Sequence, residues 1–175
     1  MHIGQFEVLK SLGKGGMGEV FLVFDPICQR RVALKKIRQD LLKHKRLHTR
    51  FLKEAQIAAK LSHPSIISIF SIHQETEELY YTMPYVEGKT LKEIVLEAKK
   101  RDAFSTTHLV RILLSVAQAI AYAHSKNILH RDLKLENIIV GTFGEVIILD
   151  WGLAEELSEK EKEELVQEPP LEEHL

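Results

Sequence analysis

The octapeptide HRDLKLEN at residues 130–137 constrains the fold and the chemistry of this chain more than any other segment. A second polar segment, the triplet DWG at residues 150–152, ends an apolar stretch thirteen residues after Asn137. Residues 138–149 between them are predicted to form two short strands joined by a Gly-containing turn. The two polar segments are therefore expected to flank a small hairpin.

The side chains in these segments match the requirements of phosphoryl transfer to a hydroxyl group. That reaction needs a carboxylate that orients the nucleophile and accepts its proton. It also needs oxygen ligands for Mg²⁺ and a cation for the phosphate charge. Asp132 is the candidate base, Asn137 and Asp150 are candidate metal ligands, and Lys134 with Lys35 supplies the cations.

A glycine-rich segment near the N-terminus points to the same chemistry. Residues 13–20, GKGGMGEV, match the pattern G-x-G-x-x-G-x-V, in which glycines let backbone N–H groups approach phosphate oxygens. A predicted strand at 19–25 follows, which favours a strand–loop–strand arrangement over nucleotide phosphates rather than the opening of a dinucleotide-binding helix. Taken alone, the motif also fits an ordinary Gly-rich hairpin turn.

Lys35 and Glu54 are predicted to pair with each other. Lys35 ends the run Val-Ala-Leu-Lys on a predicted strand, where alternation turns it inward beside Ala33. Glu54 lies within the apolar stripe of a predicted helix at 47–61. A buried ammonium and a buried carboxylate each need a partner. The alternative is an edge-strand lysine that extends into water.

The order of predicted elements indicates an α+β fold. The predicted strands span residues 6–12, 19–25, 31–37, 66–72, 79–83, 138–140 and 145–149. The predicted helices span 47–61, 89–100 after Gly88, and a longer segment that Ser105 caps and that ends before Asn127. Strands and helices do not alternate as they do in a doubly wound sheet.

In the order in which they occur, these motifs resemble the signature of the protein kinase family. More narrowly, the chain is similar to the bacterial eukaryotic-like (Hanks-type) serine/threonine kinases, and among them to the PknD-type. The narrower likeness rests on GKGGMGEV, FLKEAQIAAKLSHP and GEVIILDWG, and the resemblance covers residues 6–154. It implies an antiparallel-sheet N-lobe with one main helix, a mainly helical C-lobe, and ATP and Mg²⁺ as cofactors.

The resemblance also implies a role for each motif residue. Asp132 would be the catalytic base, Lys134 would contact the γ-phosphate, and Lys35, held by Glu54, would bind the α- and β-phosphates. Asn137 and Asp150 would hold Mg²⁺. The residues expected to bind ATP are Leu12, Gly13, Gly15, Gly18, Val20, Ala33, Lys35, Met83, Pro84, Val86 and Ile139, with Met83 as gatekeeper. A lysine two residues after the base is the serine/threonine-kinase pattern.

Three departures from the family pattern affect these expectations. Trp151 stands where the family has Phe, and Leu135 stands where it has Pro. No A-P-E motif follows Gly152. We therefore expect an N-lobe and hinge at 1–86, a C-lobe truncated after DWG at 87–154, and a flexible acidic tail at 155–175. Arg131, which pairs with an activation-loop phosphate in the family, is expected to have no partner here.

Charge and composition limit the other classes of function. The 175 residues carry a net charge of −1, which divides into +6 for residues 1–154 and −7 for residues 155–175. A hydrophobic fraction of 45% fits an ordinary globular protein. The single Cys28 indicates a reducing, cytoplasmic compartment, and no targeting or membrane segment is expected. A basic cluster at 43–53 favours a solvated helix surface over a nucleic-acid site.

The favoured function is a serine/threonine protein kinase that transfers the ATP γ-phosphate to a protein hydroxyl. The alternative is a catalytically inactive, truncated kinase-like module that binds ATP or another protein. Under either function, the apolar surface of the predicted helix at 105–126 is expected to be uncovered and to promote self-association.

Overall fold

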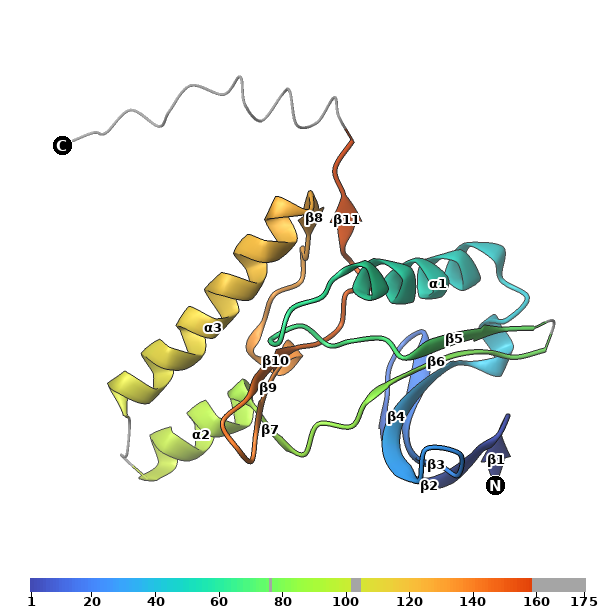
Figure 1. Ribbon diagram of the computed structural model, residues 1–175, viewed down its shortest axis with the longest axis horizontal. Helices are drawn as coiled ribbons and strands as arrows, with labels where there is room; N and C mark the ends of the chain where they lie inside the picture. Colours follow the sequence, from blue (N-terminus) through green and yellow to red (C-terminus); the bar gives the residue numbers. More distant parts are fainter. Residues whose placement is uncertain (76, 102–104, 159–175) are drawn as a thin grey trace.

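The computed structural model describes residues 1–75, 77–101 and 105–158, and its first half is a curled antiparallel sheet (Figure 1). The strand order is β1-β2-β3-β4-β6-β5, and every neighbouring pair is antiparallel. The strands are β1 (His2–Ile3), β2 (Phe6–Lys14), β3 (Gly18–Asp25), β4 (Arg30–Ile37), β5 (Ser71–Gln74) and β6 (Leu79–Pro84). A short 3-10 helix, η1 (Gln39–Leu41), leads from β4 toward the first α-helix.

Helix α1 (Lys45–Lys60) packs against this sheet because its apolar side chains recur at helical spacing. Phe51 and Ala55 on α1 form a buried cluster with Ile37 on β4 and with Leu79 and Tyr81 on β6. The expected helix at 47–61 is confirmed. The helix begins at Lys45 and ends at Lys60.

The second half combines two helices with two small sheets. Its elements are β7 (Gly88–Thr90), α2 (Leu91–Arg101), α3 (Thr106–Ser125), β8 (Ile128–Leu129), η2 (Leu135–Asn137), β9 (Ile138–Gly141), β10 (Val146–Ile148) and β11 (Glu155–Glu156). Strands β10, β9 and β7 form one sheet, and β11 pairs with β8. The Ser105 hydroxyl accepts a hydrogen bond from the His108 N–H, so the predicted cap of α3 is confirmed.

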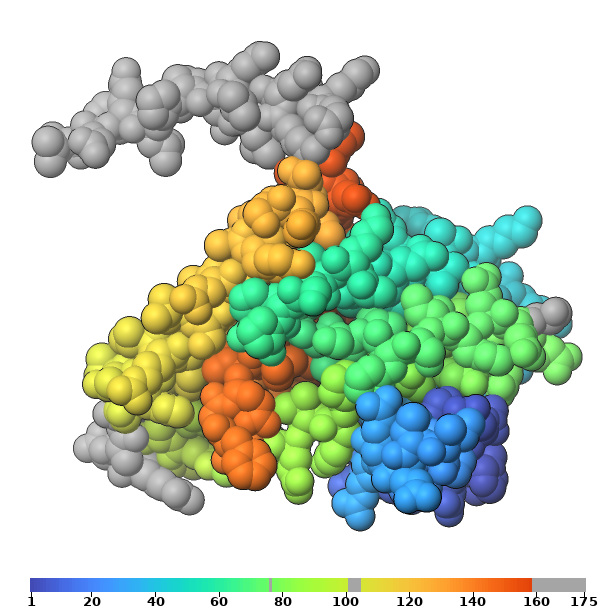
Figure 2. Space-filling view, in the orientation of Figure 1, coloured from blue at the N-terminus to red at the C-terminus, as the bar shows by residue number. Residues whose placement is uncertain are grey.

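One apolar cluster joins the two halves. It contains Ile57 of α1, Ile112 and Val116 of α3, Ile148 of β10, and Trp151. The space-filling view shows the C-terminal part of α3 against the residues that follow α1 (Figure 2). There the Tyr122 hydroxyl accepts a hydrogen bond of 3.1 Å from the backbone N–H of residue 62. The two halves therefore share a core, and the segments that flank the hairpin lie at their junction.

These observations confirm the expected α+β class, with an antiparallel sheet and one main helix on it. Two element predictions were wrong in part. The strand expected at 66–72 begins only at Ser71, because Ile66 bridges to Ile148 of β10 and so belongs to the second half. The helix expected from residue 89 begins at Leu91, because Gly88–Thr90 pairs with β9 as β7.

The segment expected to be an acidic tail begins with a paired strand. Glu155 and Glu156 form β11, and the Leu157 N–H donates to the Asn127 carbonyl. Asn127 has a φ of 59°, the left-handed conformation expected just past α3. Residues 159–175 lie outside the described part. Within the described ranges, no helix is both long and apolar enough to cross a bilayer.

Candidate active site

A cleft of about 710 Å³ lies at the junction of the two halves. Its lining comes from the segment that joins β2 to β3, from β4, α1 and β6, and from the ends of the β9–β10 hairpin. Among the sequence-predicted site residues, the cleft brings together Gly13, Gly15, Gly18, Val20, Lys35, Glu54, Met83, Asn137 and Asp150. Residues more than a hundred positions apart thus face one space.

The glycine-rich segment forms the turn between β2 and β3. The Gly15 N–H donates to the Gly18 carbonyl at 2.8 Å, which closes the turn. A Cβ at Gly18 would lie 2.6 Å from the Lys36 carbonyl oxygen on β4, so a side chain cannot fit there. By contrast, a Cβ at Gly13 or Gly16 would meet nothing within 4 Å. The base of the turn is packed against β4, whereas its tip is open for a ligand.

Lys35 and Glu54 form the ion pair that the sequence predicts. The Lys35 ammonium donates to Glu54 Oε1 at 2.5 Å, and the side chains are 16% and 3% exposed. The pair joins β4 to α1, so it ties the helix to the sheet. Oε1 also accepts a 2.7 Å hydrogen bond from the Tyr81 hydroxyl on β6, a residue that the sequence analysis did not single out.

The octapeptide forms a loop in which Asp132 is held from two sides. The Lys134 ammonium donates to Asp132 Oδ2 at 2.6 Å, and Asn137 Nδ2 donates to the same oxygen at 3.3 Å. Asn137 Nδ2 also donates to the Asp132 carbonyl at 2.9 Å. The hydrogen bond from Lys134 lowers the pKa of the Asp132 carboxyl and raises the pKa of Lys134. Asp132 is therefore an ionised carboxylate at neutral pH.

His130 supports this loop through hydrogen bonds of both ring nitrogens. Its Nδ1 accepts from the Asp132 backbone N–H at 3.3 Å, so its Nε2 is the atom that donates to the Leu149 carbonyl at 3.1 Å. The ring is 3% exposed and lies 4.5 Å from the Trp151 ring. Burial is the main cause that lowers the pKa of His130, so the ring is neutral at neutral pH.

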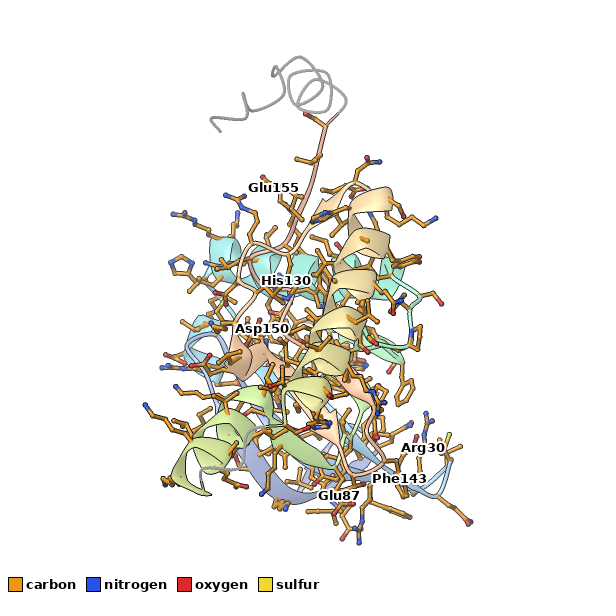
Figure 3. The ribbon with its side chains drawn as sticks, turned by 90° about the vertical axis from the view of Figure 1, so that its left-hand side faces the viewer. Arg30, Glu87, His130, Phe143, Asp150 and Glu155 are labelled. Atoms are coloured by element: carbon orange, nitrogen blue, oxygen red, sulfur yellow. The ribbon has the colours of Figure 1, made fainter. Side chains whose placement is uncertain are left out.

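The hairpin places Asp150 beside the octapeptide, as expected for segments that flank one hairpin. The Leu149 N–H donates to the Asn137 carbonyl at 2.7 Å, which closes the hairpin next to Asp150. Asp150 has a φ of 54°, and its Oδ1 accepts from the Gly152 N–H at 3.3 Å. Helix α1 reaches the same segment, because Arg50 Nε donates to the Gly152 carbonyl at 3.3 Å. Figure 3 shows Asp150 and His130 near the centre of the molecule.

Arg131 has a partner that the sequence analysis did not foresee. Its guanidinium pairs with the carboxylate of Glu155 on β11, and Arg131 itself has a φ of 64°. The expectation that Arg131 lacks a partner was therefore wrong. The reason is that β11 pairs with β8, just before the octapeptide, and brings Glu155 alongside the loop.

Seven predicted site residues lie outside the described lining of the cleft. Leu12, Ala33, Pro84 and Ile139 lie in β2, β4, β6 and β9, and Val86 lies between β6 and β7. Asp132 is hydrogen-bonded to Asn137, which lines the cleft, and Lys134 is hydrogen-bonded to Asp132. The lining residues that the sequence analysis missed are Lys14, Gly16, Met17, Ala58, Ile67, Ile69, Tyr81, Glu136, Leu149 and Trp151. Strand alternation from Met83 points to Tyr81, and one helical turn from Glu54 points to Ala58.

The donor set at this site fits Mg²⁺ bound together with phosphate. Asn137 uses its Nδ2 in the contacts above, so its Oδ1 is the atom that could face a cation, together with the Asp150 carboxylate. Mg²⁺ is held in proteins by one or two carboxylates plus water and substrate phosphates. The described residues contain no cluster of three or more His, Cys, Asp or Glu side chains that could hold a metal.

The curled sheet, the glycine-rich turn and the polar segments at this cleft are arranged as the sequence resemblance implies, and comparison with known families agrees. The family model described as "Protein kinase domain" matches residues 6–170. The chain belongs to the protein kinase family.

Among curated relatives, the chain is 49% identical over 174 residues to "Serine/threonine-protein kinase PknD" of Protochlamydia amoebophila. It is 44% identical over 170 residues to the protein of the same name from Chlamydia felis and 47% identical over 158 residues to the one from Chlamydia trachomatis. These alignments cover 94%, 93% and 86% of this chain. The chain spans only 17–18% of the length of these relatives.

Proposed function

We propose that this chain is the ATP-binding part of a serine/threonine protein kinase, which transfers the γ-phosphate of ATP to a protein hydroxyl. One observation carries the proposal. Asp132 is held as an ionised carboxylate by Lys134 and Asn137. Asn137 also lines the cleft, together with Lys35, Glu54 and Asp150. The names of the relatives support the serine/threonine class.

ATP would supply the transferable phosphoryl group, and Mg²⁺ would neutralise its charge. Lys35, held by Glu54, binds the α- and β-phosphates. The tip of the glycine-rich turn, between Gly13 and Gly18, would let phosphates approach the backbone closely, because a Cβ at Gly13 or Gly16 would meet nothing within 4 Å. Asn137 and Asp150 would hold Mg²⁺ through side-chain oxygens.

The adenine ring is proposed to lie between apolar side chains of the sheet and the hairpin. Ala33 of β4 is opposite Met83 of β6 in the strand register, which supports Met83 as gatekeeper at the end of the slot. Pro84 has no N–H but retains a carbonyl for the adenine amino group, and Val86 retains both backbone groups. The remaining walls of the slot are Leu12, Val20 and Ile139.

In the transfer step, Asp132 orients the acceptor hydroxyl and takes its proton. The hydroxyl oxygen forms a bond to the γ-phosphorus, the bond from that phosphorus to the β-γ bridging oxygen breaks, and ADP leaves with the bond's electron pair. Lys134 stabilises the charge on the transferred group. Its ammonium has three N–H donors, so it contacts a phosphate oxygen without releasing Asp132.

The substitution Asp132→Asn tests the role of the base. It retains the size of the side chain but removes the proton acceptor, so transfer from labelled ATP to a generic Ser/Thr substrate should fall by about a hundredfold or more. ATP-dependent thermal stabilisation of the protein should be retained, because Asp132 does not hold the nucleotide. Asp40→Asn is the matched control, since Asp40 is an exposed aspartate paired with Arg38.

Two results would contradict the proposal. Unchanged transfer in Asp132→Asn would remove Asp132 from the reaction. ATP-dependent stabilisation without transfer in the unsubstituted protein would favour the alternative function, a kinase-like module that binds ATP but is not catalytic.

Partners, boundaries and location are further parts of the proposal. We propose a lobe boundary at residue 86, because the chain passes there from β6 to β7 and into the second half. The single exposed Cys28 supports a reducing, cytoplasmic environment.

Val110, Leu113 and Leu114 of α3 are 56%, 56% and 57% exposed, which supports self-association through this face. A concentration-independent monomer in sedimentation velocity would contradict that contact.

A further inference from the structure

The Tyr81 hydroxyl is a buried donor inside the proposed ATP site. It donates to Glu54 Oε1 at 2.7 Å, and the same oxygen accepts from the Lys35 ammonium at 2.5 Å. Tyr81 is 4% exposed and also lines the cleft. One carboxylate oxygen thus receives two hydrogen bonds, one from β4 and one from β6, while its own side chain comes from α1.

The strand register explains how these groups meet. Lys35 of β4 and Tyr81 of β6 are direct partners across the antiparallel pair, so their side chains lie on the same face of the sheet. That face is covered by α1, and the Tyr81 ring packs 5.3 Å from the Phe51 ring. The neighbouring Tyr80 points to the other face and packs against Phe6. Tyr80 therefore serves as a control for Tyr81, because it lies on the same strand and faces the other side of the sheet.

Tyr81 is fixed in the protonated, donating state. Burial is the largest cause that raises its pKa well above 10.0, followed by the negative charge of Glu54. A hydroxyl in this state can only stabilise the neighbouring carboxylate as a donor.

We propose that Tyr81 is a positioning residue for Lys35 and that it acts through Glu54. The importance of Lys35 for phosphate binding rests on the function proposed above. Glu54 Oε2 is buried and accepts no hydrogen bond from the described residues, so the orientation of this carboxylate depends on the two donors at Oε1. Without the Tyr81 hydroxyl, Lys35 alone would hold a carboxylate that is 3% exposed.

Tyr81→Phe removes this one hydrogen bond. The Lys35 ammonium lies 5.9 Å from the Tyr81 ring centroid, and a phenyl ring preserves that contact. The protein, without ATP, is labelled with trace acetic anhydride, and mass spectrometry gives the acetylation rates of Lys35 and Lys36. Tyr81→Phe should raise the Lys35-to-Lys36 rate ratio by about tenfold, the effect of losing one hydrogen bond to a charged group.

The rate ratio separates positioning from stability. Lys36 pairs with Glu78 at 2.7 Å, so it reports on the same strand without contact to Glu54. A general loss of stability would expose both lysines and leave their ratio unchanged. Tyr80→Phe also removes a hydroxyl from a side chain that is 4% exposed, and it should leave the ratio unchanged.

An unchanged ratio in Tyr81→Phe, or the same rise in Tyr80→Phe, would overturn the proposal. If Tyr81→Phe does not fold, the second test is an NMR titration of ¹³Cζ-labelled tyrosine in the unsubstituted protein. Tyr81 should stay protonated above pH 10.0, whereas ionisation at or below the ordinary value of 10.0 would overturn the proposal. Neither measurement uses ATP. A failure of phosphate transfer would therefore contradict the proposed function without affecting the test of Tyr81.

Discussion

The two polar groups at the junction of the halves, one on the sheet and one beside the β9–β10 hairpin, are built in different ways. On the sheet side, Lys35, Glu54 and Tyr81 come from three elements and are 16% or less exposed. On the hairpin side, the Lys134 side chain is 46% exposed and the Asp132 side chain is 28% exposed. One group is enclosed by the core, and the other is open to solvent.

The difference indicates how each side serves the proposed reaction. A buried ion pair loses its hydration, so it is stable only while every partner is in place. An exposed ion pair exchanges partners with water at little cost. The sheet side can therefore hold a fixed cation for phosphate, whereas Asp132 and Lys134 are open to additional contacts with the substrates.

The largest effect on stability is expected for Glu54→Ala. The substitution leaves the Lys35 ammonium and the Tyr81 hydroxyl without their shared acceptor. Breaking a buried pair by removing one partner should cost about 3 kcal/mol, the lower end of the usual range, because Lys35 is still 16% exposed. Urea-induced unfolding followed by circular dichroism measures this change in the free energy of unfolding.

Glu78→Ala is the matched control for Glu54→Ala. Glu78 also pairs with a lysine of β4, Lys36, but these side chains are 33% and 20% exposed. Its loss should cost less than about 1 kcal/mol. Equal costs for the two substitutions would mean that burial does not distinguish the sheet side of the cleft.

The sequence predicted most of the sheet side but not Tyr81. Lys35 and Glu54 could be paired because each occurs within a local apolar pattern, and a buried charge requires a partner. Alternation from Met83 places Tyr81 on the cleft side of its strand but does not reveal its partner, since Leu79, Tyr80, Tyr81 and Thr82 are all buried. Its contact depends on the register between β4 and β6, a long-range property that periodicity does not determine.

On the hairpin side, the motif identified the residues but not their supports. The octapeptide and the DWG triplet correctly indicated that Asp132, Asn137 and Asp150 lie near one another. Glu155 was assigned to a solvated tail because its neighbours in sequence are acidic. Strands β8 and β11 have only two residues each, which is too short for an alternating pattern.

A smaller, pH-dependent effect is expected from His130, the buried part of the hairpin side. Its pKa is lowered from 6.5 by burial, so the unfolded chain binds a proton more readily than the folded protein does. The stabilising contribution is complete above pH 6.5 and is lost as the pH falls below 6.5 through the folded-state pKa. The free energy of unfolding should therefore fall between about pH 7.5 and about pH 5.5.

His130→Gln should reduce this pH dependence, measured as the difference in unfolding free energy between those two pH values. His124→Gln, a substitution of an exposed histidine on α3, is the control and should retain the full dependence. An identical pH profile for His130→Gln and the unsubstituted protein would show that burial of this ring does not affect its protonation.

The smallest effect is expected for Glu155→Ala, which removes the partner of Arg131. These side chains are 40% and 54% exposed, so the ion pair should contribute less than about 1 kcal/mol to stability. The contribution should also disappear in about 1 M NaCl, where the screening length is about 3 Å. The measurement is urea-induced unfolding at low and high salt.

Glu156→Ala is the comparison variant, because Glu156 lies next in β11 and pairs with Lys60 at 2.5 Å. Both substitutions keep the backbone pairing of β11 with β8, so neither should unfold the loop. A cost for Glu155→Ala as large as that for Glu54→Ala, or one that salt does not reduce, would contradict the contrast between the two sides. In that case, Arg131 and Glu155 would hold the octapeptide as firmly as Glu54 holds Lys35, and the hairpin side would be a fixed part of the site.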